Sequence, residues 1–225
     1  MKKPSFLLML VMLISVSAFA EFQLEPGFGY FFNTDDYDGV KRSFNGMDLN
    51  ITLRYLFTEN VGLFFGGDFK SWFSADNGEY VEQFQSAGMK ATLDDDVGCK
   101  LDLVFGLALA CPVNDKFGIQ GDLGLSATVW GIESITGTVK YMGYTVNTGI
   151  FIDKISSMGV YANVFGKYLI MQNGYITFGL RMDYKFNREE SGEVITSGVS
   201  QKYSGKEDNF SGFSIAPFIG YMGSY

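Results

Sequence analysis

Apolar and polar residues alternate one by one along much of this chain. In the segment 48–57, every odd position from Leu49 to Phe57 is apolar, and the even positions up to Arg54 are polar. Successive side chains of a β-strand point to opposite faces, so such a segment offers one apolar and one polar wall. The same alternation recurs at 61–73, 100–109, 117–129 and 176–185, and more weakly at 22–32, 160–168 and 213–221. We therefore predict eight strands, each close to the ~9–11 residues that a tilted strand needs to cross a bilayer.

The first twenty residues have the composition of a secretory signal peptide. Two lysines follow the first methionine, residues 6–14 are apolar and uncharged, and Ala18-Phe19-Ala20 matches an A-x-A cleavage pattern. The apolar core is too short for a membrane-spanning helix, which needs about 20 apolar residues. We therefore predict a cleaved signal peptide at 1–20, export of the chain, and a single folded domain at 21–225.

The remaining composition favours β-structure. Aromatic residues make up 16% of the sequence, glycines number 28, and no later apolar run reaches the length of a membrane-spanning helix. The net charge of −8 argues against nucleic acid as a partner, because phosphate binding needs a basic surface. Cys99 and Cys111 stand at opposite ends of one predicted strand, roughly 40 Å apart at ~3.3 Å per residue, so we expect two free thiols.

The predicted connections alternate between short and long. Short turns are expected at 58–60, 112–116 and 172–174, and long polar loops at 33–45, 74–97, 131–157 and 187–209. Short turns at one rim and long loops at the other are typical of outer-membrane barrels. Residues 144–153 also alternate and have a possible partner in 135–141. A ring of ten strands is therefore an alternative to the ring of eight that we favour.

Alternation by itself does not say which wall of the sheet is wet. The polar wall lines the lumen of a membrane barrel, whereas a secreted soluble β-barrel has the opposite sense. Charges deep within the strands and aromatic residues near the strand ends favour the membrane barrel, because aromatic belts suit the two headgroup interfaces. We predict an all-β, closed antiparallel up-and-down barrel in the outer membrane of a two-membrane bacterium; a secreted soluble β-barrel is the lesser alternative.

The polar wall carries equal numbers of acids and bases. Six acids and six bases stand at positions whose side chains would face the lumen. The lumen of an eight-stranded barrel is just wide enough for side chains to fill. Unpaired charges are costly to bury, so we expect pairing that closes the lumen; a gated or selective pore is the alternative. The predicted interior charge network is Glu25, Asp48, Arg54, Asp68, Lys70, Lys100, Asp102, Asp122, Lys167, Arg181, Asp183 and Lys185. Aromatic residues of lumen parity, which either line a transport pocket or fill space, are Phe31, Phe64, Trp72, Trp130, Tyr161 and Phe165.

The end of the chain is an amphipathic strand followed by an aromatic residue. Its outward positions are Phe213, Ile215, Ile219 and Tyr221, and the last residue is Tyr225. This segment resembles the C-terminal strand that the barrel assembly machinery recognises, and the whole mature chain resembles small outer-membrane barrels of the OmpA-transmembrane and OmpW type. Gly223 and Pro217 depart from the usual pattern of that strand. The resemblance implies outer-membrane lipid and the assembly machinery as partners, and a small hydrophobic ligand as a further candidate.

The sequence offers no evident catalytic or cofactor chemistry. No histidine is present, and no pair of acids stands apart from the wall network, so we expect no enzyme, no cofactor and no catalytic residues. The acidic runs 35–38 and 94–96 do not have EF-hand spacing and are interpreted as solvated charge rather than a metal site. The expected function is a structural or surface-interaction role through long extracellular loops; a narrow channel or transporter for small hydrophobic molecules is the alternative.

Overall fold

The computed structural model describes residues 20–76, 82, 90–207 and 209–225. Nearly all of the predicted signal peptide and part of the predicted loop 74–97 therefore lie outside the described residues. Within the described part of the chain, no helix is long and apolar enough to cross a membrane. The strands are β1 (Glu21–Tyr37), β2 (Val40–Leu56), β3 (Val61–Asp76), β4 (Lys90–Pro112), β5 (Phe117–Tyr141), β6 (Tyr144–Met171), β7 (Gly174–Lys185), β8 (Arg188–Thr196), β9 (Val199–Glu207) and β10 (Phe210–Ser224).

Eight of these strands form a closed antiparallel ring. Strands β1 to β7 pair in sequence order, β7 pairs with β10, and β10 pairs with β1. Closure leaves no free edge within the ring, as a sheet surrounded by lipid requires. The prediction of an all-β eight-stranded barrel is confirmed, and the ten-stranded ring is wrong. The hairpin that suggested ten strands is the continuation of β5 and β6 beyond the ring.

The two faces of the wall are as different as the alternation predicts. Apolar side chains such as Ile51, Phe105 and Leu123 point outward and are 49–61% exposed, while the charged residues between them are buried in the lumen. On β1 the outward residues are apolar from Phe22 to Phe32 and become polar at Thr34. Ten steps of ~3.3 Å, tilted by about 45°, give a belt roughly 25 Å tall, which matches the hydrocarbon band of outer-membrane barrels.

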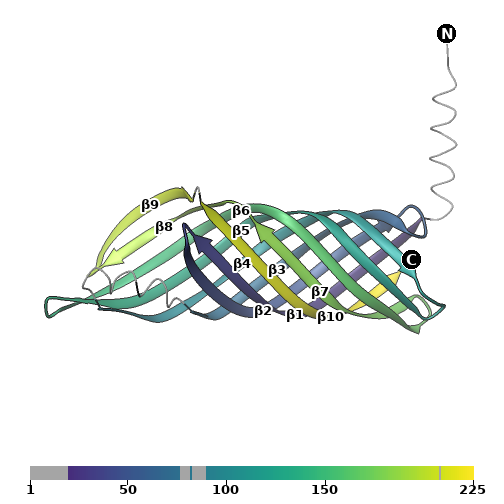
Figure 1. Cartoon of the computed structure of the whole chain (residues 1–225), viewed down its shortest axis with the longest axis horizontal. Helices are drawn as coiled ribbons and strands as arrows, with labels where there is room; N and C mark the ends of the chain where they lie inside the picture. Colours follow the sequence, from purple (N-terminus) through teal and green to yellow (C-terminus); the bar gives the residue numbers. More distant parts are fainter. Residues whose placement is uncertain (1–19, 77–81, 83–89, 208) are drawn as a thin grey trace, which may run out of the picture.

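One end of the barrel is extended by paired strands. Figure 1 shows the short turns and the C terminus at one end, and β8, β9 and the tip of the β5–β6 hairpin projecting at the other. Strand β8 pairs with the first half of β6, and β9 pairs only with β8. We call this projecting part the β-extension. It is formed by the halves of β4, β5 and β6 that lie furthest from the short turns, together with β8 and β9, and we call this end of the barrel the upper end.

The predicted long loops 33–45, 131–157 and 187–209 are therefore largely strands. Each contains a tight hairpin turn whose two residues have positive φ: Asp38-Gly39, Met142-Gly143 and Ser197-Gly198. A glycine in the second position suits such turns, whose twist matches that of the flanking strands. The loop prediction was wrong because polar composition was interpreted as irregular structure, although strands are joined by backbone hydrogen bonds, which polar residues form as well as apolar ones. The Asp-Gly and Met-Gly pairs were the available hairpin signals.

The two cysteines are free, as predicted. Cys111 is exposed near the rim with the short turns, and Cys99 lies further along β4 with intermediate exposure. No disulfide contributes to the stability of the barrel, which rests on ring closure and on the packing of the lumen.

Candidate functional site

In the half of the barrel nearest the short turns, which we call the lower half, a fully buried arginine occupies the lumen. Arg54 of β2 donates hydrogen bonds to Asp122 of β5, with its Nε 2.9 Å from Oδ1 and its Nη2 2.6 Å from Oδ2. Its remaining Nη1 lies 2.6 Å from Oε2 of Glu25 on β1, and its guanidinium stacks 4.6 Å from the ring centre of Phe165. One cation therefore links three strands across the lumen. All the charged partners are buried from solvent.

A second arginine crosses the lumen in the next layer. Arg181 of β7 approaches Asp48 of β2 with a distance of 2.8 Å between Nη1 and Oδ2, and donates through Nη2 to the side-chain oxygen of Asn50 at 2.5 Å. Asp68 of β3 lies 3.9 Å from the same guanidinium, which also stacks 4.0 Å above the ring of Phe218. Arginine suits this position because its planar fork binds carboxylates and stacks on aromatic rings at once.

Two lysines and two aspartates form the third layer. Lys70 lies 3.2 Å from Asp102 and 3.7 Å from Asp183, and Lys185 lies 3.3 Å and 3.2 Å from the same two carboxylates. A hydroxyl group also donates a hydrogen bond to one of these carboxylates, from Thr128 to Asp102 at 2.5 Å. Each charge thus has an opposite neighbour, the condition under which buried ions are tolerated.

The predicted interior charges are brought together almost as a set. Eleven of the twelve are buried, and Lys167 is only half buried, with its Nζ 5.0 Å from the ring of Tyr175. Lys100 is buried against the ring of Phe44 rather than in an ion pair between described residues. The space enclosed beside Asp68, Lys70 and Tyr161 is too small to hold one water molecule. The lumen of the described barrel is a packed core at this level.

Five of the six predicted lumen aromatics are buried, and Trp130 is not. Phe31, Phe64, Trp72, Tyr161 and Phe165 are each at most 3% exposed, whereas Trp130 is 42% exposed on the outer wall. A bulge explains the exception: Leu101 of β4 pairs with Trp130 but its neighbour Asp102 pairs with Thr128, so β5 carries one extra residue at Val129. An extra residue reverses the parity of everything beyond it. Glu133, which has outward parity by simple counting, therefore faces the lumen.

Above the apolar belt, a cluster of four carboxylates and two arginines closes the mouth of the barrel. Arg42 of β2 donates to Asp96 of β4 through Nε at 3.0 Å and pairs with Glu133 of β5. Arg188 of β8 pairs with the same Glu133 at 3.0 Å, with Asp35 of β1 at 3.4 Å and with Glu190 at 2.7 Å. We call these residues the mouth cluster: Asp35, Arg42, Asp96, Glu133, Arg188 and Glu190.

The sequence did not reveal the mouth cluster. All of its members lie in segments that the sequence predicts to be loops, and Glu133 has outward parity until the bulge is known. The interpretation of the acidic runs as solvated charge was wrong for Asp35 and Asp96, which are 2% and 4% exposed. Among the described residues, no group of three or more His, Cys, Asp or Glu side chains is arranged to hold a metal ion.

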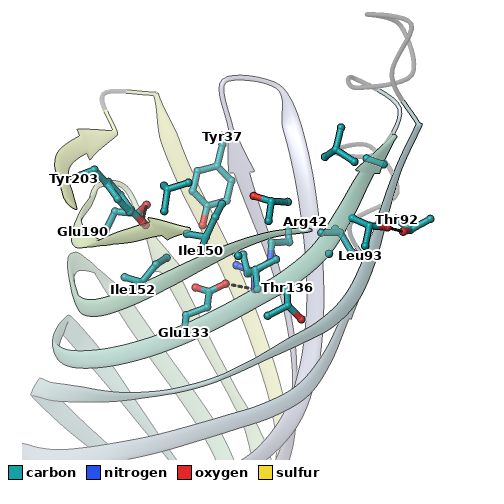
Figure 2. A pocket seen from close by; sticks show the side chains of 18 of the residues that line it. Tyr37, Arg42, Thr92, Leu93, Glu133, Thr136, Ile150, Ile152, Glu190 and Tyr203 are labelled. Atoms are coloured by element: carbon teal, nitrogen blue, oxygen red, sulfur yellow. Dashed lines mark hydrogen bonds and ion pairs between the residues drawn. The ribbon is translucent and has the colours of Figure 1, made fainter. Parts of the chain in front are cut away.

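A pocket of about 280 Å³ opens directly above the mouth cluster. Figure 2 shows its side chains converging from separate strands: Tyr37 from β1, Arg42 from β2, Leu93 from β4, Glu133 from β5 and Ile150 from β6. The wall is mostly apolar, and its aliphatic members are Ala91, Leu93, Ile135, Val139, Ile150, Ile152 and Val194. We call this cavity the mouth pocket: its walls are apolar, and its floor is formed by charged residues of the mouth cluster.

Two tyrosines flank the mouth pocket. The Tyr203 hydroxyl of β9 donates to Oε1 of Glu190 at 3.1 Å, and the ring of Tyr37 lies under the guanidinium of Arg188, 5.6 Å from its centre. Burial raises the pKa of Tyr203, and the Glu190 carboxylate raises it further, so this phenol keeps its proton and remains a donor. Both rings also present a face or edge to the pocket, since both residues line it.

The C-terminal strand β10 closes the ring by pairing with β1. Phe213, Ile219 and Tyr221 are 42–58% exposed on the outer wall of β10, together with the half-buried Ile215. Tyr225 exchanges two backbone hydrogen bonds with Phe22 of β1, at 2.8 and 3.0 Å, and its ring is 79% exposed. The predicted assembly residues thus lie together on one lipid-facing stripe.

Comparison with known proteins finds resemblance in fold alone. No family model and no curated protein matches the chain. Among solved structures, a major outer membrane protein from Thermus thermophilus is similar at 15% identity, covering 92% of this chain and 99% of that one, with a TM-score of 0.49. The outer membrane protein OprG from Pseudomonas aeruginosa matches at 13% identity, 92% and 96% coverage and a TM-score of 0.46. Ail of Yersinia pestis matches at 14% identity, 91% and 99% coverage and a TM-score of 0.38.

The first two of these proteins are outer-membrane proteins by name. The closed eight-stranded ring of this chain is by itself the architecture of a small outer-membrane β-barrel. At such low identities the likeness says nothing of function. The membrane assignment rests on the barrel itself: a closed ring, an apolar belt on its outside and buried charges within.

Proposed function

We propose that this chain is a non-conducting outer-membrane barrel that acts at the cell surface through its β-extension. The observation that supports this role is the packing of the lumen, where three successive layers of ion pairs span the barrel from wall to wall. Short turns mark the periplasmic rim of such barrels and the longer connections their outer face. The β-extension is therefore the part that meets the surroundings of the cell, and we propose a structural or surface-interaction role without enzymatic chemistry.

Single-channel recording in planar bilayers tests the closed lumen. We expect no stable openings, because passage of a hydrated ion would require at least three buried ion-pair layers to separate together. Heat-modifiable migration in detergent gels, measured on the same preparation, establishes that the inserted protein is a folded barrel. Stable openings whose amplitude follows the salt concentration would contradict the proposed function.

A narrow transporter for small hydrophobic molecules is the second candidate, and the mouth pocket is the observation that favours it. Its greasy wall would accept such a molecule from outside, but the mouth cluster lies between the pocket and the lumen below. Uptake of an apolar fluorescent probe into vesicles measures this directly. Our proposal expects the same rate with and without the protein, and a protein-dependent rate would favour transport.

For the remaining partners we propose outer-membrane lipid around the apolar belt and the barrel assembly machinery at β10. The lipid contact is supported by the outward apolar residues, and the assembly contact by the exposed aromatic stripe that ends at Tyr225. The latter is tested among the predictions of the Discussion.

A further inference from the structure

The floor of the mouth pocket carries more negative than positive charge. The mouth cluster contains four carboxylates but only two guanidinium groups, and none of its side chains is more than 14% exposed. Lys100 lies below against the ring of Phe44, and counting it still leaves the carboxylates in excess. Within the mouth cluster the two arginines direct their donors at carboxylates, so an anionic ligand would meet donors that are already committed.

The walls of the mouth pocket suit an apolar body of modest size. Seven aliphatic side chains line it, and its volume of about 280 Å³ is near the lower end of the ~300–1,000 Å³ typical of ligand pockets. Tyr37 and Tyr203 add aromatic rings beside the charged floor. An aromatic face next to buried carboxylates is the environment in which organic cations bind, because both the ring quadrupole and the carboxylate attract positive charge.

We propose that the mouth pocket is a binding site for a small organic cation with an apolar or aromatic body. The body packs against Ile135, Ile150 and Val194, and the ammonium group lies toward Glu133 and Glu190, flanked by the two tyrosines. The mouth cluster forms a closed floor, so the cation is held and released on the same side. This inference deepens the proposed function, since it names a ligand class for the β-extension.

The protein contains a built-in reporter for this site. Of its two tryptophans, Trp72 is buried below the mouth pocket and its indole Nε1 donates to Asp96 at 3.3 Å, whereas Trp130 is on the outer wall. In the Trp130→Phe protein, emission from Trp72 therefore follows changes in the mouth cluster. The probes are phenethylammonium, 2-phenylethanol and phenylacetate, which share a ring and differ in the charge of the head group.

We expect saturable binding of phenethylammonium at pH 7, with a Kd at least fivefold lower than that of 2-phenylethanol, and the weakest binding for phenylacetate. Glu190→Gln should reduce the preference for the cation over the alcohol, with the larger change in the affinity for the cation. Equal affinities for the three probes, or no saturable binding of any of them, would overturn the proposal.

A matched pair of variants places the binding in the mouth pocket. Ile150→Phe fills the pocket and should abolish binding of all probes, whereas Ile195→Phe makes the same change at an outward, 40% exposed position of the neighbouring β8. Heat-modifiable migration checks that both variants fold. Binding that survives Ile150→Phe contradicts the site. The bilayer recording tests the proposed function separately. A barrel that shows no openings and binds no cation would refute this inference alone, whereas a conducting barrel would refute the proposed function.

Discussion

Replacing Arg54 by methionine should destabilise the barrel strongly. Arg54 has no solvent exposure, and its loss leaves two buried carboxylates, Glu25 and Asp122, without the cation that lies 2.6 Å from each. Removing one partner of a buried ion pair typically costs about 3–5 kcal/mol. The stacking on Phe165 is lost as well. We expect Arg54→Met to lower the free energy of unfolding by about 4 kcal/mol or more.

Equilibrium unfolding by urea in lipid vesicles measures this change. With a slope of about 2 kcal/mol per molar urea, a loss of about 4 kcal/mol moves the unfolding midpoint by about 2 M. The triple variant Arg54→Met, Glu25→Gln, Asp122→Asn should recover at least half of the loss, because it removes the unpaired charges together with the arginine. Recovery separates the cost of stranded carboxylates from a simple loss of packing.

The surface pair Lys202–Glu193 provides the control. Its charged atoms are 4.0 Å apart and the lysine side chain is 86% exposed, so Lys202→Met should leave the midpoint unchanged within error. If Arg54→Met shifted the midpoint as little as this control, Glu25 and Asp122 would have to be hydrated. The lumen would then be wet, and the closed-barrel reasoning would be refuted.

Three further predictions test the wall, its packing and its assembly. Brominated lipids should quench the emission of Trp130 in a Trp72→Phe protein and leave Trp72 unquenched in a Trp130→Phe protein; the reverse result would contradict the bulge. Gly106→Ala should cost about 1–3 kcal/mol in urea unfolding, because a Cβ there lies 2.3 Å from a backbone oxygen of the neighbouring strand, whereas Gly67→Ala, with 3.9 Å of room, should be nearly neutral. Tyr225→Ala should lower the amount of heat-modifiable barrel in cell envelopes, while the urea midpoint of the variant refolded in vesicles stays close to that of the unchanged protein. A normal amount in envelopes, or a loss matched by a large fall in the midpoint, would argue against an assembly signal.

The charged interior was predictable to the extent that parity persists along a strand. Arg54 and Asp102 lie in regular segments, and their burial follows from alternation alone. Parity fails beyond an irregularity, as at Trp130 and Glu133, because one inserted residue reverses the faces of the strand. The sequence does carry a sign of the bulge, because Val129 and Trp130 are consecutive apolar residues and Ile132 beyond them is apolar at an even position.

The mouth pocket could not be predicted for a different reason. Its residues come from the ends of strands whose polar composition resembles that of loops, and strands β8 and β9 alternate too weakly to be recognised. A polar segment forms a strand when a neighbouring backbone is within reach, and that neighbour is supplied by the ring. Arg188 meets Glu133 because β8 pairs with β6 and not with β7.

The sequence by itself favoured eight strands over ten, predicted the closure of the ring and favoured the apolar wall as the side that faces lipid. These follow from local periodicity and from the cost of leaving backbone groups unpaired in an apolar medium. Only the tertiary structure decided which charges meet, because Arg54, Glu25 and Asp122 come from strands whose relative heights are set by register and stagger around the ring. The same stagger, together with one bulge, assembled the mouth cluster and the pocket above it.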